Sequence, residues 1–289
     1  MINKIVPPLL KNKIKDTLYN RFGFLNVTRP YNIQLRYKKN LEDKVAIVTG
    51  GSGAIGRAIC CRMAAEGAIV YVCGMTESKI SVVVKEITDL GGEAYATKLD
   101  VTNEENIREA FKRIIDKHGK IDILVTSAGG SAREKSNIIP DQDIEVIDEV
   151  LKINLRGTML CAREASIQMV KQKSGKIIAL SSTIGVGGKA GFSEYAAAKG
   201  GVVLFVKSLA MELGKYGINV NCVSPGIVQR DQINQLQLER VKQTNYLNSY
   251  CTPEDISNMV TFLVSEEASF ITGQNFIVDG GRSLGLKGD

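Results

Sequence analysis

From residue 41 onwards, short apolar runs alternate with longer segments whose apolar residues recur at helical spacing. Continuous runs rich in β-branched residues are typical of buried strands, and a 3.6-residue period is typical of amphipathic helices. The short runs predict seven strands, at 45–49, 69–73, 94–98, 121–126, 176–181, 218–223 and 275–279. The longer segments predict helices at 54–66, 77–90, 103–118, 143–171, 193–216 and 253–265.

Regular alternation of strand and helix is typical of βαβ units, which build a parallel sheet with helices on both faces. The pattern therefore predicts an α/β fold, a doubly wound parallel sheet of about seven strands. Such a sheet binds ligands at the carboxyl ends of its strands, so we expect the functional residues directly after strands. Residues 227–252 form a long polar, amide-rich segment without a strand-like run.

The composition is that of an ordinary globular protein, with 289 residues, 44% of them hydrophobic and 24% charged. No apolar run approaches the roughly 20 residues that cross a membrane, and the N-terminus lacks a secretory pattern, so we expect a cytoplasmic protein. The six cysteines lack Cys-x-x-Cys spacing and indicate reduced core residues. The single histidine, His118, argues against a Ser-His-Asp triad or a His-rich zinc site, and we expect no metal.

Charge is concentrated at the N-terminus. Residues 1–40 carry nine Lys or Arg and one acid, a net charge of +8, whereas residues 41–289 sum to −2. Apolar residues at 10, 14, 18 and 22 predict an amphipathic basic helix over 8–22. We expect this helix to pack on its own domain or on a neighbouring subunit. Contact with an anionic membrane surface is the alternative, and no nucleic-acid motif accompanies the charge.

The segment Val48–Gly56, VTGGSGAIG, lies between a predicted strand and a predicted helix. Glycines allow a tight turn there, and a helix N-terminus offers free N–H groups and positive potential to a pyrophosphate. In this context the turn indicates a dinucleotide-binding site, and a plain flexible turn is the alternative.

Tyr195 and Lys199 lie four residues apart at the start of a predicted helix, so we expect both side chains on one face. The ordinary pKa of tyrosine is near 10, and a neighbouring ammonium lowers that pKa because it favours the phenolate. Tyrosine then becomes an acid–base group near neutral pH. Ser182 ends a predicted strand thirteen residues earlier and is placed to hold a substrate oxygen. Packing and capping are the alternative roles for these residues.

With these motifs in this order, the chain resembles the short-chain dehydrogenase/reductase family over about residues 41–283. The resemblance rests on the turn at 49–56, Asp100-Val101, SAGG at 127–130, Asn154, Ser182, Tyr195-x-x-x-Lys199, Pro225-Gly226 and Val278-Asp279-Gly280-Gly281. It implies a Rossmann-like sheet, and it divides the chain into a basic extension over 1–40 and a single oxidoreductase domain over 41–289. It also implies a homodimer or a homotetramer.

By this resemblance, Tyr195 exchanges a proton with the substrate oxygen while hydride moves between the substrate carbon and nicotinamide. Lys199 holds the nicotinamide ribose and lowers the pKa of Tyr195, Ser182 polarises the carbonyl, and Asn154 holds a water that links Lys199 to solvent. Asp100 accepts from the adenine amino group. The implied cofactor contacts are Gly50, Ser52, Gly53, Ile55, Gly56, Gly74, Met75, Asp100, Val101, Ala128, Gly129, Tyr195, Lys199, Pro225, Gly226 and Ile227.

Three positions depart from the family pattern. Ala54 replaces the usual glycine inside the turn, Thr126-Ser127 replaces the usual Asn-Asn, and Arg230 stands where threonine often contacts the cofactor. The strand at 69–73 is followed by Gly74, so the acid that binds the ribose of NAD is missing. Because no carboxylate repels a 2′-phosphate there, we favour NADP(H) over NAD(H).

Together these residues predict an NAD(P)(H)-dependent alcohol dehydrogenase or carbonyl reductase that interconverts a ketone and a secondary alcohol. The amide-rich segment 227–252 favours a small sugar- or polyol-like substrate, although a solvated helix face explains the amides equally well. A 3-oxoacyl-thioester reductase and a non-catalytic dinucleotide-binding scaffold are the alternatives. The complete catalytic set of Asn154, Ser182, Tyr195 and Lys199 argues against a scaffold.

Overall fold

The computed structural model describes residues 39–229 and 235–285, with the backbone alone for 235–238. Seven strands form one parallel sheet in the order β3-β2-β1-β4-β5-β6-β7. They are β1 Val45–Thr49, β2 Ile69–Gly74, β3 Glu93–Lys98, β4 Ile123–Thr126, β5 Gly175–Leu180, β6 Ile218–Pro225 and β7 Asn275–Val278. The predicted doubly wound α/β fold is confirmed. The strand order reverses between β1 and β4, which is where a sheet of this kind binds its ligand.

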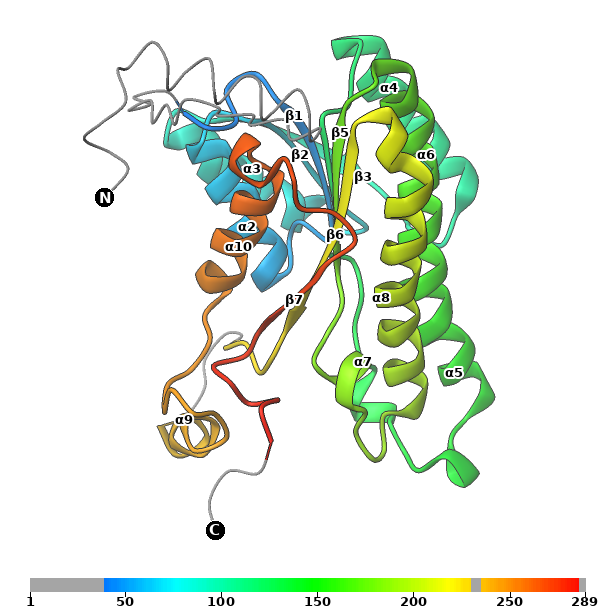
Figure 1. The fold of residues 1–289 in the computed structure, drawn as a ribbon, viewed down its shortest axis with the longest axis vertical. Coiled ribbons are helices and arrows are strands. Elements are labelled where there is room, and N and C mark those ends of the chain that lie inside the picture. The colour runs from blue at the N-terminus through cyan, green and yellow to red at the C-terminus, as the bar shows by residue number, and fades with distance from the viewer. Residues whose placement is uncertain (1–38, 230–234, 286–289) are drawn as a thin grey trace, which may run out of the picture. The chain divides into compact units, whose positions relative to one another are not determined.

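Helices cover both faces of the sheet (Figure 1). One layer holds α2 (Ala54–Ala65), α3 (Glu77–Asp89) and α10 (Pro253–Val264). The opposite layer holds α4 (Glu104–His118), α6 (Gly157–Gln172) and α8 (Ser193–Leu213). The helices α5 (Ile144–Leu151), α7 (Ile184–Gly187) and α9 (Gln235–Lys242) lie beyond the carboxyl ends of the strands.

Each face of the sheet has its own apolar core. In β1, Val45 and Ile47 pack with the layer of α4, α6 and α8, whereas Ala46 and Val48 pack with the layer of α2, α3 and α10. All four side chains are fully buried. Burial on both faces explains why the strands appear in the sequence as continuous apolar runs, which is typical of parallel sheets.

Most elements begin and end close to their predicted bounds, and two differences bear on the site. The helix predicted over 143–171 is interrupted, because a π-helical turn at Lys152–Arg156, η4, joins α5 to α6. The segments between β5 and α8 and between β6 and α10, where the sequence predicts neither a strand nor a helix, contain α7 and α9. Both helices are too short for an apolar period to predict them.

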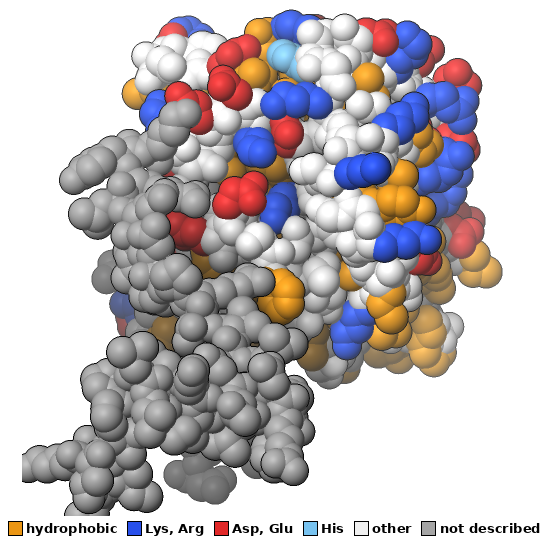
Figure 2. Space-filling view, turned by 45° about the horizontal axis from the view of Figure 1, so that its top comes forward, with side chains coloured by type: hydrophobic (Ala, Val, Ile, Leu, Met, Phe, Trp, Pro, Cys, Tyr) orange, Lys and Arg blue, Asp and Glu red, His pale blue; other side chains and the backbone are white. Residues whose placement is uncertain are grey.

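Positive and negative side chains are interspersed over the part of the surface that Figure 2 shows, with no field of a single sign. Among the described residues, no helix is long and apolar enough to cross a membrane. The helix predicted over 8–22 lies outside the described residues, as does Arg230. The packing expected of that helix, and a role for Arg230, therefore stay predictions.

Candidate active site

The turn after β1 is held in shape by very close backbone contacts. Gly50 has a φ of +65°, and a Cβ on it would lie 2.8 Å from the backbone nitrogen of Ala128. A Cβ on Gly56 would lie 2.2 Å from the carbonyl oxygen of Gly50. Neither position accepts a side chain, so these two glycines are required by the turn itself.

This turn opens onto a cleft of about 1000 Å³ at the carboxyl ends of β1 to β4. Eleven of the residues predicted to contact the cofactor line it, namely Gly50, Ser52, Gly53, Ile55, Gly56, Gly74, Met75, Asp100, Val101, Ala128 and Gly129. α2 begins at Ala54, and no side chain caps its N-terminus at Gly53. The first N–H groups of α2 are therefore available to an anion in the cleft. Ala54 also lines the cleft.

Asp100 lies at the mouth of the cleft and is fixed by its own turn. Its Oδ1 accepts hydrogen bonds from the backbone N–H and the hydroxyl of Thr102, both at 2.8 Å. Its backbone N–H donates to Oδ1 of Asn106 at 2.8 Å. The carboxylate is therefore held in one orientation without an ion pair.

Hydroxyl groups replace the amides that the family usually has after β4. The hydroxyl of Thr49 accepts a hydrogen bond from the N–H of Ala128 at 3.2 Å and ties the end of β1 to the loop after β4. The hydroxyl of Thr126 is buried and has no hydrogen-bond partner among the described residues. The sequence gives no signal for Thr49, because only the strand register brings it opposite Thr126.

Asn154 lies in the π-helical turn η4 and is fully buried. Its Nδ2 donates to the carbonyl oxygens of Val150 and Gly130, both at 2.9 Å, and its Oδ1 accepts from the N–H of Gly130 at 3.2 Å. The hydroxyl of Thr158 donates to the Asn154 carbonyl at 2.8 Å. The wider turn thus places the Asn154 amide against the loop after β4, and π-helical turns of this kind are frequent at functional sites.

Lys199 is buried in α8 and points towards the same loop. Its Nζ donates to the carbonyl oxygen of Leu180 at the end of β5, at 2.7 Å. The neighbouring Ser181 donates its hydroxyl to the Lys199 carbonyl at 2.7 Å, so two bonds lock α8 to β5. A Cβ on Gly129 would lie 2.3 Å from Oδ1 of Asn154 and 3.5 Å from Nζ of Lys199. Asn154 and Lys199 therefore meet at Gly129, which lines the cleft, although neither of these two side chains lines it.

Ser182 and Tyr195 flank this meeting point from β5 and α8. The hydroxyl oxygen of Ser182 accepts a hydrogen bond from the N–H of Ile184 at 3.2 Å, which leaves its own proton to donate. The ring of Tyr195 packs against the cluster of Val146, Val150 and Ala198. Nζ of Lys199 lies 5.8 Å from the centre of that ring. The predicted one-turn spacing thus puts both groups on one side of α8.

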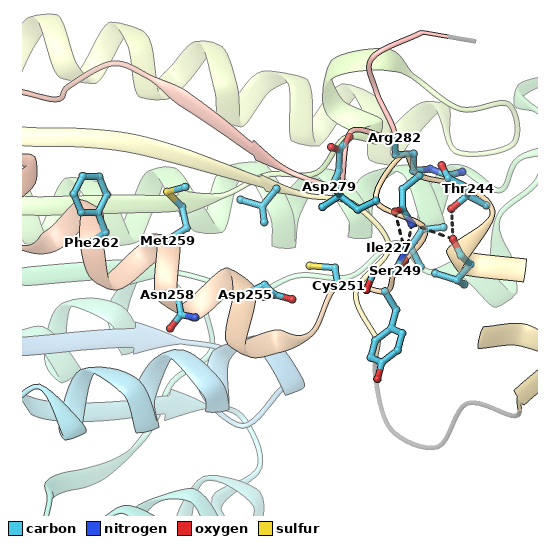
Figure 3. Close-up of a pocket in the computed structure, with 16 residues that line it drawn as sticks. Ile227, Thr244, Ser249, Cys251, Asp255, Asn258, Met259, Phe262, Asp279 and Arg282 are labelled. Carbon is cyan, nitrogen blue, oxygen red and sulfur yellow. Dashed lines mark hydrogen bonds between the residues drawn. The ribbon is translucent and has the colours of Figure 1, made fainter. Parts of the chain in front are cut away.

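The remaining predicted contacts lie after β6. The N–H of Thr183 donates to the carbonyl of Pro225 at 3.0 Å, which puts the Pro225 loop beside Ser182. The N–H of Gly226 donates to Val278 at 2.9 Å. Ile227 lines a second cavity, of about 550 Å³, between α10, the segment after α9 and the end of β7 (Figure 3). Sequence reasoning did not find this cavity, because its walls come from segments far apart in the chain.

The thiols around the site are not candidate acid–base groups. Burial raises the pKa of Cys222 in β6 to about 11, although Lys199 opposes that rise. Burial also raises the pKa of Cys251, beside the second cavity, to about 11. All six cysteines are free thiols, and four of them are buried as predicted, whereas Cys61 and Cys251 are only partly buried. A raised pKa keeps the thiols of Cys222 and Cys251 protonated at neutral pH.

A parallel sheet with a glycine-rich cleft and a buried Tyr-x-x-x-Lys helix defines a Rossmann-type oxidoreductase. Residues 50–283 match the family model described as enoyl-(acyl carrier protein) reductase. The chain belongs to the short-chain dehydrogenase/reductase family, and the resemblance drawn from its motifs is confirmed.

Relatives and solved structures agree with this assignment. A 3-oxoacyl-[acyl-carrier-protein] reductase of Synechocystis sp. is 38% identical over 246 residues, which are 84% of this chain and 98% of the relative. The corresponding reductase of Aquifex aeolicus is 37% identical over 245 residues, 83% of this chain and 98% of the relative. A short-chain dehydrogenase/reductase structure from Mycobacterium ulcerans has a TM-score of 0.80 at 30% identity, covering 85% of this chain and 91% of that one. A putative gluconate dehydrogenase from Agrobacterium tumefaciens has a TM-score of 0.81 at 29% identity, covering 87% and 100%.

Proposed function

We propose that this protein reduces the 3-oxo group of an acyl thioester to a 3-hydroxy group, with NADP(H) as the hydride source. The observation that carries the proposal is the meeting of Asn154 and Lys199 at Gly129, which lines the dinucleotide-sized cleft, beside Ser182 and Tyr195. The names of the two bacterial reductases support the substrate, since nearly their whole length aligns with this chain.

The cleft suits a dinucleotide. Gly53 precedes α2 as its N-cap residue and offers no side-chain cap, and a Cβ on it would meet only the Gly50 carbonyl oxygen, at 3.4 Å, so the backbone there is open to a pyrophosphate. Asp100, which the resemblance assigns to the adenine, lines the cleft, and Lys199, which it assigns to the nicotinamide ribose, lies beside the lining residue Gly129. When bound, a reduced nicotinamide supplies the hydride.

The residues of the chain then supply the proton and orient the substrate carbonyl. Ser182 donates its hydroxyl hydrogen to the 3-oxo oxygen, which fixes the carbonyl and polarises it. Tyr195 donates its phenolic proton to the same oxygen while C3 accepts the hydride, so a C–H bond and an O–H bond form and the C=O double bond becomes a C–O single bond. Lys199 stabilises the phenolate that Tyr195 becomes, and a proton from solvent restores it. The balance is one ketone, one NADPH and one proton to one alcohol and one NADP⁺.

We prefer an acyl thioester as the substrate over the sugar- or polyol-like substrate that the sequence favours. The polyol reading depended on the amide side chains of residues 227–252, and Asn245 uses its amide within its own loop. Nδ2 of Asn245 donates to the carbonyls of Val241 and Ser249, and its Oδ1 accepts from the N–H of Ser249. This amide therefore has a structural role and gives no support to a hydroxyl-rich substrate.

The end of β2 supports NADP(H). Gly74 ends the strand without a carboxylate, and a Cβ on it would lie 3.4 Å from the hydroxyl of Ser52 in the turn after β1. Lys79, one turn into α3, lines the cleft at the same end. A 2′-phosphate there meets a cation and a hydroxyl and no acid from β2.

The test is an absorbance assay of NADPH and NADH oxidation with acetoacetyl-CoA, run beside a panel of ketoses. We expect NADPH-dependent reduction of the thioester and little turnover of the ketoses. Turnover confined to ketoses, or faster turnover with NADH, contradicts the proposed substrate or the proposed cofactor respectively.

A further inference from the structure

The short helix α7 contacts the backbone of the catalytic helix α8. It lies beside the first turns of α8, at the carboxyl ends of the strands (Figure 1). A Cβ on Gly185 of α7 would lie 2.6 Å from the carbonyl carbon of Lys199, 2.7 Å from the Lys199 Cβ and 2.8 Å from the backbone nitrogen of Gly200. Cβ atoms essentially never come within 3.0 Å of another atom, so only glycine at position 185 permits this approach.

This contact has glycine on both sides. A Cβ on Gly200 of α8 would lie 3.1 Å from the carbonyl oxygen of Gly185, which is tighter than an ordinary contact. Neither Gly185 nor Gly200 has a positive φ, so the backbone conformation does not require glycine at either position. What the two glycines provide is therefore the close approach of α7 to α8 beside Lys199.

The turn that begins α7 is formed by Ser182. The hydroxyl oxygen of Ser182 accepts a hydrogen bond from the N–H of Ile184 at 3.2 Å. The carbonyl oxygen of Ser182 accepts a second bond, from the N–H of Gly185, at 2.9 Å. Ser182 and the first residues of α7 thus form one hydrogen-bonded turn. A displacement of Gly185 therefore also displaces the Ser182 hydroxyl.

The α8 side of the contact is fixed, whereas α7 has room to move. The carbonyl oxygen of Lys199 accepts from the hydroxyl of Ser181, and its Nζ donates to the carbonyl of Leu180, both at 2.7 Å. These two bonds hold Lys199 to the end of β5. The other side of α7 is exposed, with Val186 at 51%. A side chain at position 185 therefore pushes α7 outwards and leaves Lys199 in place.

We propose that Gly185 is a positioning residue, whose contact with Lys199 sets the place of the Ser182 hydroxyl relative to Tyr195. The inference rests on the proposed thioester reduction, in which Ser182 and Tyr195 both donate to the 3-oxo oxygen. These two donors belong to different elements, since Ser182 follows β5 and Tyr195 lies in α8. The glycine contact is a point where the two elements meet, so it brings both donors within reach of one oxygen atom.

The first variant is Gly185→Ala, assayed with acetoacetyl-CoA and NADPH. A Cβ at 2.6 Å must move by about 0.8 Å to reach 3.4 Å, where ordinary van der Waals contact begins. A misplacement of about 1 Å costs about 10²-fold in rate, so we expect kcat to fall by about 10–10²-fold. The dissociation constant for NADPH should equal that of the unchanged protein, because Lys199 and the turn after β1 stay in place.

Two further variants bracket this effect. Gly187→Ala is the matched control, because Gly187 belongs to the same helix, has no positive φ, and a Cβ on it would meet nothing within 4 Å. Its kcat should equal that of the unchanged protein. Gly200→Ala presses on the same contact from α8, where a Cβ at 3.1 Å requires only a small shift, so its loss in kcat should be smaller than that of Gly185→Ala. Because alanine suits a helix interior, Gly200→Ala also tests the proposal where Gly185→Ala does not fold.

A double-mutant cycle with Ser182→Ala separates positioning from a general loss of structure. Removing one donor to the reacting oxygen lowers kcat by about 10²–10³-fold. In the Ser182→Ala background, Gly185→Ala should cost little further activity, because the hydroxyl that it displaces is gone. A merely structural role would give the same loss in both backgrounds.

Activity of Gly185→Ala equal to that of Gly187→Ala overturns the positioning role, and so does an equal loss with and without the Ser182 hydroxyl. Weaker binding of NADPH by Gly185→Ala also overturns it, because the effect then runs through Lys199. If the unchanged protein reduces no 3-oxoacyl thioester, the proposed function fails, and this role fails with it. That result differs from thioester reduction that is insensitive to Gly185→Ala, which overturns the positioning role alone.

Discussion

Replacing Gly129 with alanine should disrupt the site, whereas the same change at Gly130 should not. A Cβ on Gly129 would lie 2.3 Å from Oδ1 of Asn154, while a Cβ on Gly130 meets nothing within 4 Å. The Asn154 amide must therefore move in Gly129→Ala. The two glycines are adjacent in one loop, so the pair separates the contact from any general effect of alanine.

Moving Asn154 breaks the three hydrogen bonds of its side chain, two with Gly130 and one with Val150. At about 1 kcal/mol each, their loss lowers the free energy of unfolding by about 2–3 kcal/mol. Lys199 need not move, because its Nζ would lie 3.5 Å from the same Cβ position, an ordinary contact, so the displaced group is the Asn154 amide. A shift of about 1 Å in such a group lowers turnover by about 10²-fold.

The assays are urea unfolding and the steady-state rate of thioester reduction, run for both variants. A double-mutant cycle with Asn154→Ala adds a direct test of the contact, because that background removes the atoms that collide. In it, Gly129→Ala should cost much less stability than in the unchanged protein. If Gly129→Ala is as stable and as active as Gly130→Ala, the contact between Gly129 and Asn154 does not hold the site.

Two further changes test other parts of the account. Gly74→Asp should shift cofactor preference from NADPH towards NADH, because a carboxylate repels the 2′-phosphate. Gly74→Ala is the control, since any Cβ at this position lies 3.0 Å from the Ile80 side chain. Equal shifts in cofactor preference in both variants contradict the charge argument. Burial, with help from Lys117, lowers the pKa of His118, which hydrogen-bonds the Tyr71 hydroxyl at 2.7 Å. The folded chain then binds fewer protons than the unfolded chain, so this contribution to stability is complete above pH about 6.5 and is lost as the pH falls through the folded pKa. His118→Gln should lose less unfolding free energy between pH 7.5 and 5.5 than the unchanged protein, and parallel losses rule out His118 as the cause.

The sheet could be predicted from the sequence because its central strands are buried on both faces. β1 is fully apolar up to Thr49, and each of the other strands comes within one or two residues of its predicted start or end. The places of Tyr195, Lys199 and Ser182 in the fold could be predicted, because the first two depend only on helical spacing and Ser182 only on the end of a strand. Helical spacing and strand ends depend on residues that are close together in the chain, so the local sequence pattern predicts them.

What could not be predicted depends on contacts between distant segments. The π-helical turn at Lys152–Arg156 forms where Asn154 bonds to Gly130, 24 residues away in the chain. The bond from Ser181 to Lys199, and that from Ala128 to Thr49, likewise join elements that only the fold brings together. The second cavity has the same origin, since α10 and the end of β7 form its walls.

The central claim is that Tyr195 supplies the proton in a reduction driven by hydride from NADPH. The most direct measurement is the turnover of 3-oxoacyl thioester by Tyr195→Phe, beside its dissociation constant for NADPH. Tyr216→Phe serves as a matched control, since Tyr216 is partly buried in the turn Gly214–Tyr216 that follows α8 and lines neither cavity. The account predicts that Tyr195→Phe binds NADPH about as tightly as the unchanged protein but turns over about 10²–10⁴-fold more slowly. Turnover in Tyr195→Phe equal to that of Tyr216→Phe would contradict it.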